Sequence, residues 1–299
     1  MYTPPNQNNR RIVITGANSG TGKEAAKRLA AAGAEVVMAV RTLSKGQAAR
    51  DEILREVPHA RLSVERLDLA DLASIHAFVD HIIADGRPID TLINNAGVMN
   101  PPHRETTADG FELQFGSNFL GPFALTNLLV PTLRRGTSPR VVTMTSSAAI
   151  TASIDFQDLN SERSYRPMRA YSQSKLADHL FGLELSRLSQ LHGWGILSTL
   201  AHPGYTRTNL LMSGPNYGTD RITKAWYYKL VPSMNIPRGT EPLLMAAADP
   251  SASQGDFYGP QFLMVGAARK IKAPKSVRRV DPSRLWQAAA ELTGTRTPA

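Results

Sequence analysis

The chain has 299 residues, a formal net charge of +9 and a hydrophobic fraction of 42%. This composition is ordinary for a soluble globular protein and excludes a disordered or collagen-like chain. The absence of cysteine excludes a disulfide framework, a thiol nucleophile and a cysteine-based metal site.

Short apolar runs alternate with longer amphipathic stretches along most of the chain. The runs predict buried strands over Ile12–Thr15, Val36–Val40, Leu62–Leu67, Thr91–Asn94, Val141–Thr145 and Ile196–Ala201. Strand-then-helix repetition implies right-handed crossovers and hence a parallel sheet with helices on both faces. No linker-like stretch interrupts the series before about residue 205, so we expect a single α/β domain over residues 1–299 with a doubly wound sheet.

A glycine-rich segment, Thr15–Gly22, follows the first predicted strand and opens the next helix. A dinucleotide pyrophosphate needs a tight turn, close approach of the backbone and free amides at a helix N-terminus, and glycines permit all three. The spacing here is Gly-x-x-x-Gly-x-Gly, which differs from the general Gly-x-Gly-x-x-Gly fingerprint. The segment predicts a phosphate-binding turn of a Rossmann fold, built from Gly16, Asn18, Ser19, Gly20, Thr21 and Gly22.

The second and third predicted strands end at residues suited to the adenosine half of a dinucleotide. Arg41 stands where an NAD-selective protein carries Asp or Glu, about 20 residues beyond the glycine turn. A guanidinium pairs with the 2′-phosphate that a carboxylate would repel, so we expect NADP(H) in preference to NAD(H) unless Arg41 is only a surface cation. Asp68, followed by Leu69, could accept a hydrogen bond from the adenine amino group or cap the next helix.

Tyr171 and Lys175 stand at positions i and i+4, so they share one face of the helix predicted to run toward Leu191. An isolated phenol loses its proton only near pH ~10, but an adjacent ammonium and the positive nicotinamide of an oxidised cofactor stabilise the phenolate. Tyr171 can then exchange a proton with an alcohol or a carbonyl. Ser146 and Ser147 end the fifth predicted strand, where a hydroxyl can steady the substrate oxygen.

Residues 205–239 form a weakly patterned stretch in which Gly and Pro punctuate apolar side chains. Long irregular insertions are usually lids or binding loops, so we expect a substrate lid here. The alternative is that these side chains only cap the core. The apolar members are Leu210, Leu211, Met212, Tyr217, Trp226, Tyr227, Tyr228 and Met234.

The remaining features speak against other partners and locations. No aromatic residue interleaves with a basic cluster near the C-terminus, so we expect a solvated surface or attraction of anionic small molecules rather than nucleic acid. The basic cluster consists of Arg269, Lys270, Lys272, Lys275, Arg278 and Arg279.

The seven histidines show no metal-ligand spacing, so no metal is expected. A polar N-terminus and the lack of an apolar run of roughly 18 residues predict a cytoplasmic protein without a membrane span.

Taken in order, these motifs resemble those of the short-chain dehydrogenase/reductase family over nearly the whole chain. The matching stretches are Thr15–Gly22, Asn94–Gly97, Asn118, Ser147, Tyr171 with Lys175, and Pro203-Gly204 followed by Thr208. The resemblance implies a catalytic tetrad of Asn118, Ser147, Tyr171 and Lys175, with Ser146 as the less favoured serine. It also implies that Tyr171 and Lys175 lie against the cofactor, together with Asn95, Ala96, Gly97, Pro203, Gly204, Thr206 and Thr208.

Within the family, the chain is most similar to the retinol-dehydrogenase-type branch. Two departures matter. Phe119 and Pro122 stand where branch members often carry a His-containing stretch, and no apolar anchor precedes the predicted fold. A retinoid substrate is therefore not implied, and we expect a bulky apolar alcohol or carbonyl. The similarity rests on Asn95–Met99, Thr107–Glu112, Asp158-Leu159, Leu285-Trp286 and Glu291–Gly294.

Together the patterns predict an NADP(H)-dependent oxidoreductase that interconverts an alcohol and a carbonyl of a small molecule, with Tyr171 as general acid/base. One alternative is a cofactor-sensing regulator, which replacement of Tyr171 or Lys175 would have favoured. Another is a nucleotide-sugar epimerase or dehydratase, which usually has a Gly-x-x-Gly-x-x-Gly turn. The resemblance also implies a homodimer or homotetramer paired through helices around 118–133 and 170–191.

Overall fold

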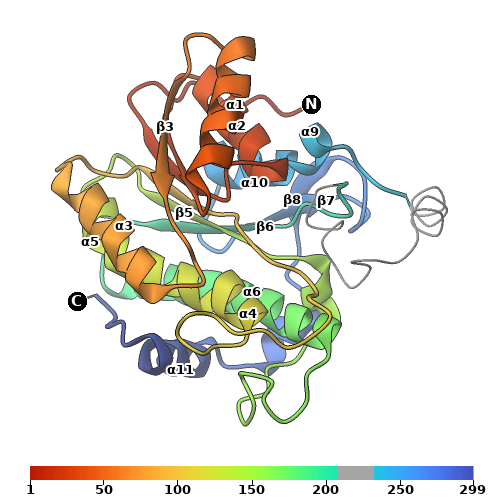
Figure 1. Ribbon diagram of the computed structural model, residues 1–299. Helices are drawn as coiled ribbons and strands as arrows, with labels where there is room; N and C mark the ends of the chain where they lie inside the picture. The colour runs from red at the N-terminus through yellow and green to blue at the C-terminus, as the bar shows by residue number, and fades with distance from the viewer. Residues whose placement is uncertain (208–231, 299) are drawn as a thin grey trace.

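The computed structural model describes residues 1–207 and 232–298. In this part of the chain the strands form one eight-stranded sheet in the order β3-β2-β1-β4-β5-β6-β7-β8. The sheet runs through the middle of the molecule, with helices on either side (Figure 1). The strands are β1 (Arg11–Thr15), β2 (Glu35–Val40), β3 (Arg61–Arg66), β4 (Thr91–Asn94), β5 (Arg140–Met144), β6 (Leu197–Ala201), β7 (Phe257–Pro260) and β8 (Ala268–Ile271).

The first seven strands are parallel, and β8 runs antiparallel to β7 at the edge of the sheet. The six strands predicted from apolar runs are all present, with ends that differ by one residue at most positions. β7 and β8 were missed because one contains Gly259 and Pro260 and the other carries Arg269 and Lys270, so neither is an apolar run. Charged side chains are typical of an edge strand, where they discourage pairing with another chain.

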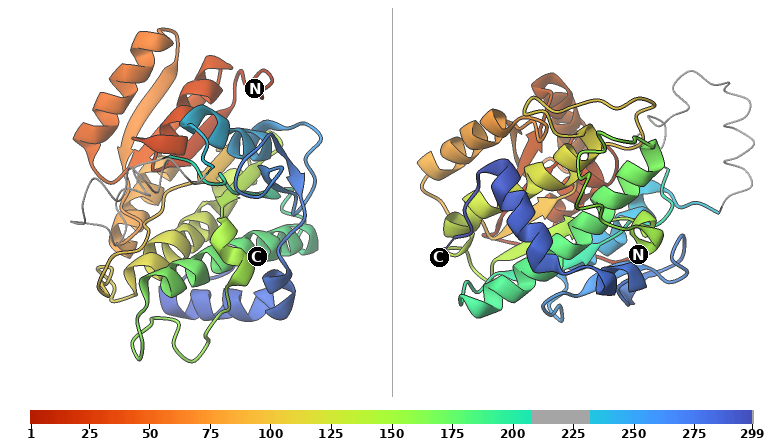
Figure 2. Two further views of the ribbon diagram at one scale, coloured as in Figure 1. Left: turned by 90° about the vertical axis from the view of Figure 1, so that its right-hand side faces the viewer. Right: turned by 90° about the horizontal axis from the view of Figure 1, so that it is seen from below.

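Helices cover both faces of the sheet, which confirms the doubly wound fold. Side chains alternate between the faces along each strand: Ile12 and Ile14 pack with one helix layer, and Val13 packs with the other. Figure 2 shows the two layers from other directions. One layer holds α1 (Gly20–Ala31), α2 (Leu43–Glu56), α9 (Ile236–Gly239) and α10 (Glu241–Ala248), and the other holds α3 (Leu72–Ala84), α4 (Leu113–Phe115), α5 (Gly121–Leu133), α6 (Pro167–Leu191) and α11 (Pro282–Thr293).

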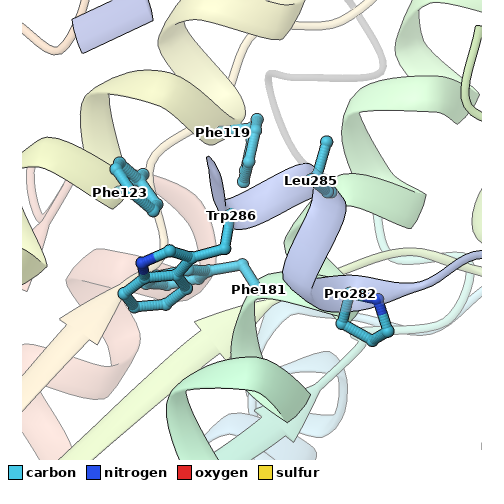
Figure 3. A pocket seen from close by; sticks show the side chains of 6 residues that line it. All are labelled: Phe119, Phe123, Phe181, Pro282, Leu285 and Trp286. Carbon is cyan, nitrogen blue, oxygen red and sulfur yellow. The ribbon is translucent and has the colours of Figure 1, made fainter. Parts of the chain in front are cut away.

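The C-terminal helix α11 packs on the outer side of α5 and α6. The Trp286 ring contacts Phe123 edge-on at a centroid distance of 4.8 Å and stacks on Phe181 at 5.7 Å. Figure 3 shows these rings converging with Phe119 and Leu285 around a small apolar pocket. This part of α5 and α6 is therefore covered by the chain itself. Pairing of two copies through these helices stays a prediction and would have to use other parts of their surfaces.

The described residues bear on the predictions about membranes and metals. None of the helices there has both the length and the apolar character needed to span a bilayer. In the same residues, no three His, Asp or Glu side chains gather closely enough to hold a metal ion.

Candidate active site

The predicted site residues follow the carboxyl ends of successive strands. The chain winds outward from β1 to β3 on one side and from β4 to β7 on the other, so the direction of winding reverses between β1 and β4. A crevice at such a reversal is where doubly wound proteins bind ligands. The residues that lie just beyond the strand ends are Gly16, Arg41, Asp68, Asn95, Ser147 and Pro203.

The glycine-rich turn packs tightly against the chain after β4. Gly16 has a φ of +67°, a region that a side chain disfavours, and a Cβ there would lie 2.9 Å from the Ala96 Cα. A Cβ on Gly22 would lie 2.5 Å from the Asn95 side-chain nitrogen. These two glycines are therefore required by local packing as well as by any ligand.

Hydrogen bonds hold the turn in place. The Thr21 hydroxyl donates to Asn95 Oδ1 at 2.9 Å, and Asn95 Nδ2 donates to the Thr15 carbonyl at 2.9 Å. The Asn95 and Ala96 amides both donate to the Thr15 hydroxyl at 3.0 Å. The turn and the segment after β4 thus form one rigid unit.

The first turn of α1 offers backbone donors at this edge. The helix begins at Gly20, and its N-cap residue Ser19 makes no side-chain capping bond. The first amides of a helix have no partner within the helix, and the helix dipole adds positive potential there. These donors are suited to bind an anionic group above the turn.

Arginines follow both β2 and β3 at this edge. Arg41 is exposed and makes no ion pair or hydrogen bond with any described residue. Arg66, the last residue of β3, is also exposed and is paired in register with Val40, directly before Arg41. Sequence reasoning overlooked Arg66, which only the register of the strands brings next to Arg41.

Asp68 and Leu69 have separate roles after β3. Asp68 Oδ1 accepts a hydrogen bond from the Ala70 amide at 3.0 Å, which leaves Oδ2 without a partner among the described residues. The helix that follows is capped by Asp71, so capping by Asp68 is wrong. Leu69 is buried, and its carbonyl lies against Gly121, where a Cβ would come within 2.4 Å.

Asn118 lies in a π-helix, η1 (Gly116–Leu120), that joins α4 to α5. One such turn inserted into an α-helix often marks a functional position. Asn118 Oδ1 accepts from the Val98 amide at 2.7 Å, and Nδ2 donates to the Val98 carbonyl at 3.0 Å and to Ser174 Oγ at 2.9 Å. The side chain therefore ties the segment after β4 to helix α6.

Ser146 and Ser147 are distinguished by their hydrogen bonds. Ser146 Oγ caps the 3-10 helix η2 (Ser147–Thr151) by accepting from the Ala148 amide at 3.2 Å. The hydroxyl of the half-buried Ser147 makes no hydrogen bond to a described residue, so it remains available to a ligand. Tyr171 is a buried residue, and its hydroxyl likewise has no hydrogen-bond partner among the described residues. Helix α6, which carries Tyr171, packs against η2.

Lys175 lies one turn beyond Tyr171 and is 4% exposed. Its ammonium donates to the Met144 carbonyl at the end of β5, at 3.1 Å, and to Asp178 Oδ2 at 2.7 Å. Burial opposes the charge of Lys175, but the contact with Asp178 outweighs it and raises the pKa of the ammonium. Burial also raises the pKa of Asp178, against the effect of Lys175. Sequence reasoning missed Asp178 because one Asp on a helix is usually a solvated side chain.

Two further contacts bring the tetrad and the β4 segment together. A Cβ on Gly97 would lie 3.2 Å from Asn118 Oδ1 and 3.7 Å from Lys175 Nζ. The Thr145 hydroxyl donates to the Lys175 carbonyl at 2.7 Å, which fixes the helix against β5. Asn118, Lys175 and the end of β5 thus border the same part of the sheet edge.

The segment after β6 forms the remaining side. Gly204 has a φ of +61°, and Thr206 Oγ1 donates to the Pro203 carbonyl at 2.6 Å. Thr206 is buried and forms a bridge with Met234. Thr208 and residues 208–231 of the predicted lid lie outside the described residues.

These observations fit the binding of a dinucleotide. The turn is a cradle that a Cβ would fill, and the N-cap of α1 makes no side-chain capping bond. Arg41, just after β2, is a cation that pairs with none of the described residues. The hydroxyls of Tyr171 and Ser147 bond to no residue in the described part of the chain, so they are available to a second, smaller ligand. The arrangement can bind an anionic cofactor and move a proton.

Comparison with known proteins points the same way. Residues 10–216 match the family model described as short chain dehydrogenase. Human retinol dehydrogenase 13 is 37% identical over 295 residues, which cover 97% of this chain and 86% of that protein. Human retinol dehydrogenase 12 is 44% identical over 200 residues, which cover 67% of this chain and 62% of that protein. A solved structure of an uncharacterized protein from Mycobacterium paratuberculosis has a TM-score of 0.81 and 37% identity, covering 99% of this chain and 97% of its own.

Proposed function

The chain belongs to the short-chain dehydrogenase family of oxidoreductases, and we propose that it interconverts an alcohol and a carbonyl with NADP(H). The observation that carries the proposal is the arrangement of Tyr171 and Lys175 on α6, tied through Ser174 to Asn118 at the carboxyl edge of the sheet. Proton transfer and charge stabilisation are the two tasks that this arrangement can perform.

Tyr171 would act as the general acid/base. Its hydroxyl donates a proton to the carbonyl oxygen in reduction and accepts one from the alcohol in oxidation, a role worth roughly 10²–10⁴-fold. The Lys175 ammonium stabilises the phenolate form by its charge. Ser147 would donate a hydrogen bond to the substrate oxygen, since its hydroxyl has no described protein partner. When bound, the nicotinamide dinucleotide supplies or accepts the hydride.

The cofactor would lie across the reversal between β1 and β4. The backbone of the glycine-rich turn would bind the pyrophosphate, and Asp68 Oδ2 is available to the adenine amino group. Lys175 and the segments 95–97 and 203–206 would border the nicotinamide end. A preference for NADP(H) is supported by Arg41, whose guanidinium is exposed and unpaired among the described residues.

A bulky apolar alcohol or carbonyl is the proposed substrate class. Two similar proteins are retinol dehydrogenases by name, and retinol is a large apolar alcohol. The apolar content of residues 205–239 supports the same class. The retinoid itself is not part of the proposal.

The test is a screen of NADPH and NADH oxidation with ketones and aldehydes of graded size, together with alcohol oxidation by NADP⁺. We expect turnover with NADPH, and kcat/KM that rises with the apolar size of the carbonyl compound. Better use of small polar ketones or sugars would reject the substrate class. Tight NADPH binding without turnover on any substrate would favour the cofactor-sensing alternative.

A further inference from the structure

Asp178 and Lys175 form an ion pair in the protein interior, where their side chains are 2% and 5% exposed. We propose that Asp178 is a positioning residue, which keeps the Lys175 ammonium charged and held against the end of β5. The proposal rests on the proposed function, because it concerns the lysine that serves Tyr171 and the cofactor. Asp178 itself is not expected to touch substrate.

The surroundings of Lys175 offer no other counter-charge among the described residues. The groups that influence its charge are Asp178 and Tyr171, both on α6. At β5 the ammonium donates to the neutral Met144 carbonyl. The amide side chain of Asn118 and the ammonium both lie within 3.7 Å of a Cβ built on Gly97. A buried lysine without an anion tends to lose its proton, so Asp178 is the group that keeps this ammonium charged.

Asp178 is also incompletely satisfied as a structural residue. Its Oδ2 accepts from Lys175, but Oδ1 is buried without a hydrogen-bond partner among the described residues. An ionised pair in the interior is costly, and apolar residues of similar volume often stabilise a protein better. The backbone of Lys175 is already fixed by the Thr145 hydroxyl. We therefore assign Asp178 the function of holding the Lys175 ammonium and keeping it charged.

The informative variant is Asp178→Asn, which keeps the shape and a hydrogen-bond acceptor but removes the charge. Burial would then lower the pKa of Lys175, with only the influence of Tyr171 left to oppose it. We expect a smaller deficit at about pH 6.5 than at higher pH, because a lysine with a lowered pKa is more fully protonated in acid. At about pH 9 we expect an extra loss of about tenfold, the effect of one pKa unit on proton occupancy, in both NADPH affinity and kcat/KM.

Glu184→Gln provides a matched control on the same helix. Glu184 also pairs at i+3, with Arg187 at 2.7 Å, and its side chain is only 4% exposed, but no described contact links it to the site. This variant should follow the wild type at every pH. Thermal unfolding of each cofactor-free protein shows that the variants are folded, and Asp178→Ser replaces Asp178→Asn if the latter does not fold.

The measurements are the NADPH dissociation constant, from nicotinamide fluorescence, and kcat/KM, both from about pH 6 to about pH 9.5. A loss in Asp178→Asn that grows with pH supports the proposal. Profiles that superimpose on the wild type, or an equal loss at every pH, overturn it. Tighter NADPH binding at every pH also overturns it, because Asp178 would then compete with the cofactor for Lys175.

The wild-type protein separates this proposal from the function on which it rests. A wild type that neither binds NADPH nor reduces any carbonyl compound rejects the proposed function. An active wild type whose profile Asp178→Asn leaves unchanged rejects only the role of Asp178.

Discussion

Asn118 donates a hydrogen bond to Ser174 Oγ at 2.9 Å, and Ser174 Oγ donates to the Tyr171 carbonyl at 2.8 Å. The π-helix between α4 and α5 is thereby connected to the turn of α6 that carries the acid–base pair. Because Asn118 also bonds both polar groups of Val98, it holds two segments that border the cofactor site. We infer that its role is to fix the spacing of the site.

Asn118→Ala should therefore lower both stability and turnover. It leaves buried partners on Val98 and Ser174 unsatisfied, which costs about 2–4 kcal/mol in the free energy of unfolding. Displacement of α6 by a fraction of an ångström should lower kcat by about tenfold or more. Urea unfolding and steady-state kinetics measure the two effects. Asn127→Ala is the control, because Asn127 is also buried but bonds only the Phe123 carbonyl in its own helix, so kcat should be retained.

Tyr171→Phe should lower kcat by about 100-fold or more, since a positioned proton donor contributes roughly 10²–10⁴-fold. The NADPH dissociation constant should change little, because the hydroxyl meets the substrate oxygen. Tyr258→Phe on β7 removes another tyrosine hydroxyl, which donates to Asp249 at 3.0 Å, and should leave kcat unchanged. Near-normal turnover of Tyr171→Phe would contradict the assignment of the general acid/base.

Arg41→Ala should reduce the preference for NADPH over NADH. Loss of a charged hydrogen bond to the 2′-phosphate should weaken NADPH binding by about 1.5–3 kcal/mol and leave NADH nearly unaffected. Comparison of KM for both cofactors in wild type and variant measures this difference. Arg61→Ala serves as the control. Arg61 is an exposed arginine at the start of β3, away from the carboxyl edge of the sheet, and it donates to the Gly33 carbonyl. Equal use of both cofactors by the wild type would show that NADP(H) is not preferred.

Trp286→Ala should destabilise the protein without altering the chemistry of the folded molecules. Trp286 is 5% exposed and contacts the rings of Phe123 and Phe181, so its truncation should cost about 3–5 kcal/mol. Leu292→Ala on the same helix removes a side chain that is 37% exposed and should change the free energy of unfolding by less than about 0.5 kcal/mol. An equal effect of the two substitutions would mean that α11 is not part of the core. The predicted pairing of two copies is a separate question, which sedimentation of the wild type addresses by measuring its oligomeric state.

The sequence was informative where one residue type has one physical use. Apolar runs predicted β1, β2, β4, β5 and β6, because a strand covered by helices on both faces must be largely apolar. The edge strand β3 was predicted as well, although it carries Glu65 and Arg66 and is only partly buried. The glycine-rich turn was predicted correctly in position, since the close approach of Asn95 to Gly22 leaves no room for a side chain.

Features that depend on distant parts of the chain could not be predicted. The pairing of Asp178 with Lys175 matters only because both are buried, and burial follows from how α6 packs on β5. The position of Arg66 beside Arg41 follows from strand register.

Two buried histidines should make the protein sensitive to mild acid. His179 on α6 and His202 after β6 flank the Phe257 ring, at centroid distances of 4.8 and 5.3 Å. Burial lowers the pKa of His179 to about 3 and that of His202 to about 4. Unfolded histidine titrates near ~6.5, so below that pH the unfolded chain binds protons that the folded protein does not.

Their contribution to stability is therefore complete above about pH 6.5 and is lost as the pH falls toward the folded pKa values. At pH ~5 the loss should be about 2 kcal/mol for each histidine. His179→Leu should remove the part of this loss that His179 causes. Between about pH 7.5 and pH 5, the free energy of unfolding should therefore fall less in the variant than in the wild type. Asp178, whose raised pKa acts in the opposite direction, is common to both proteins and cancels in the comparison. His59→Gln, an exposed histidine, should behave as the wild type, and equal losses in the wild type and His179→Leu would contradict the prediction.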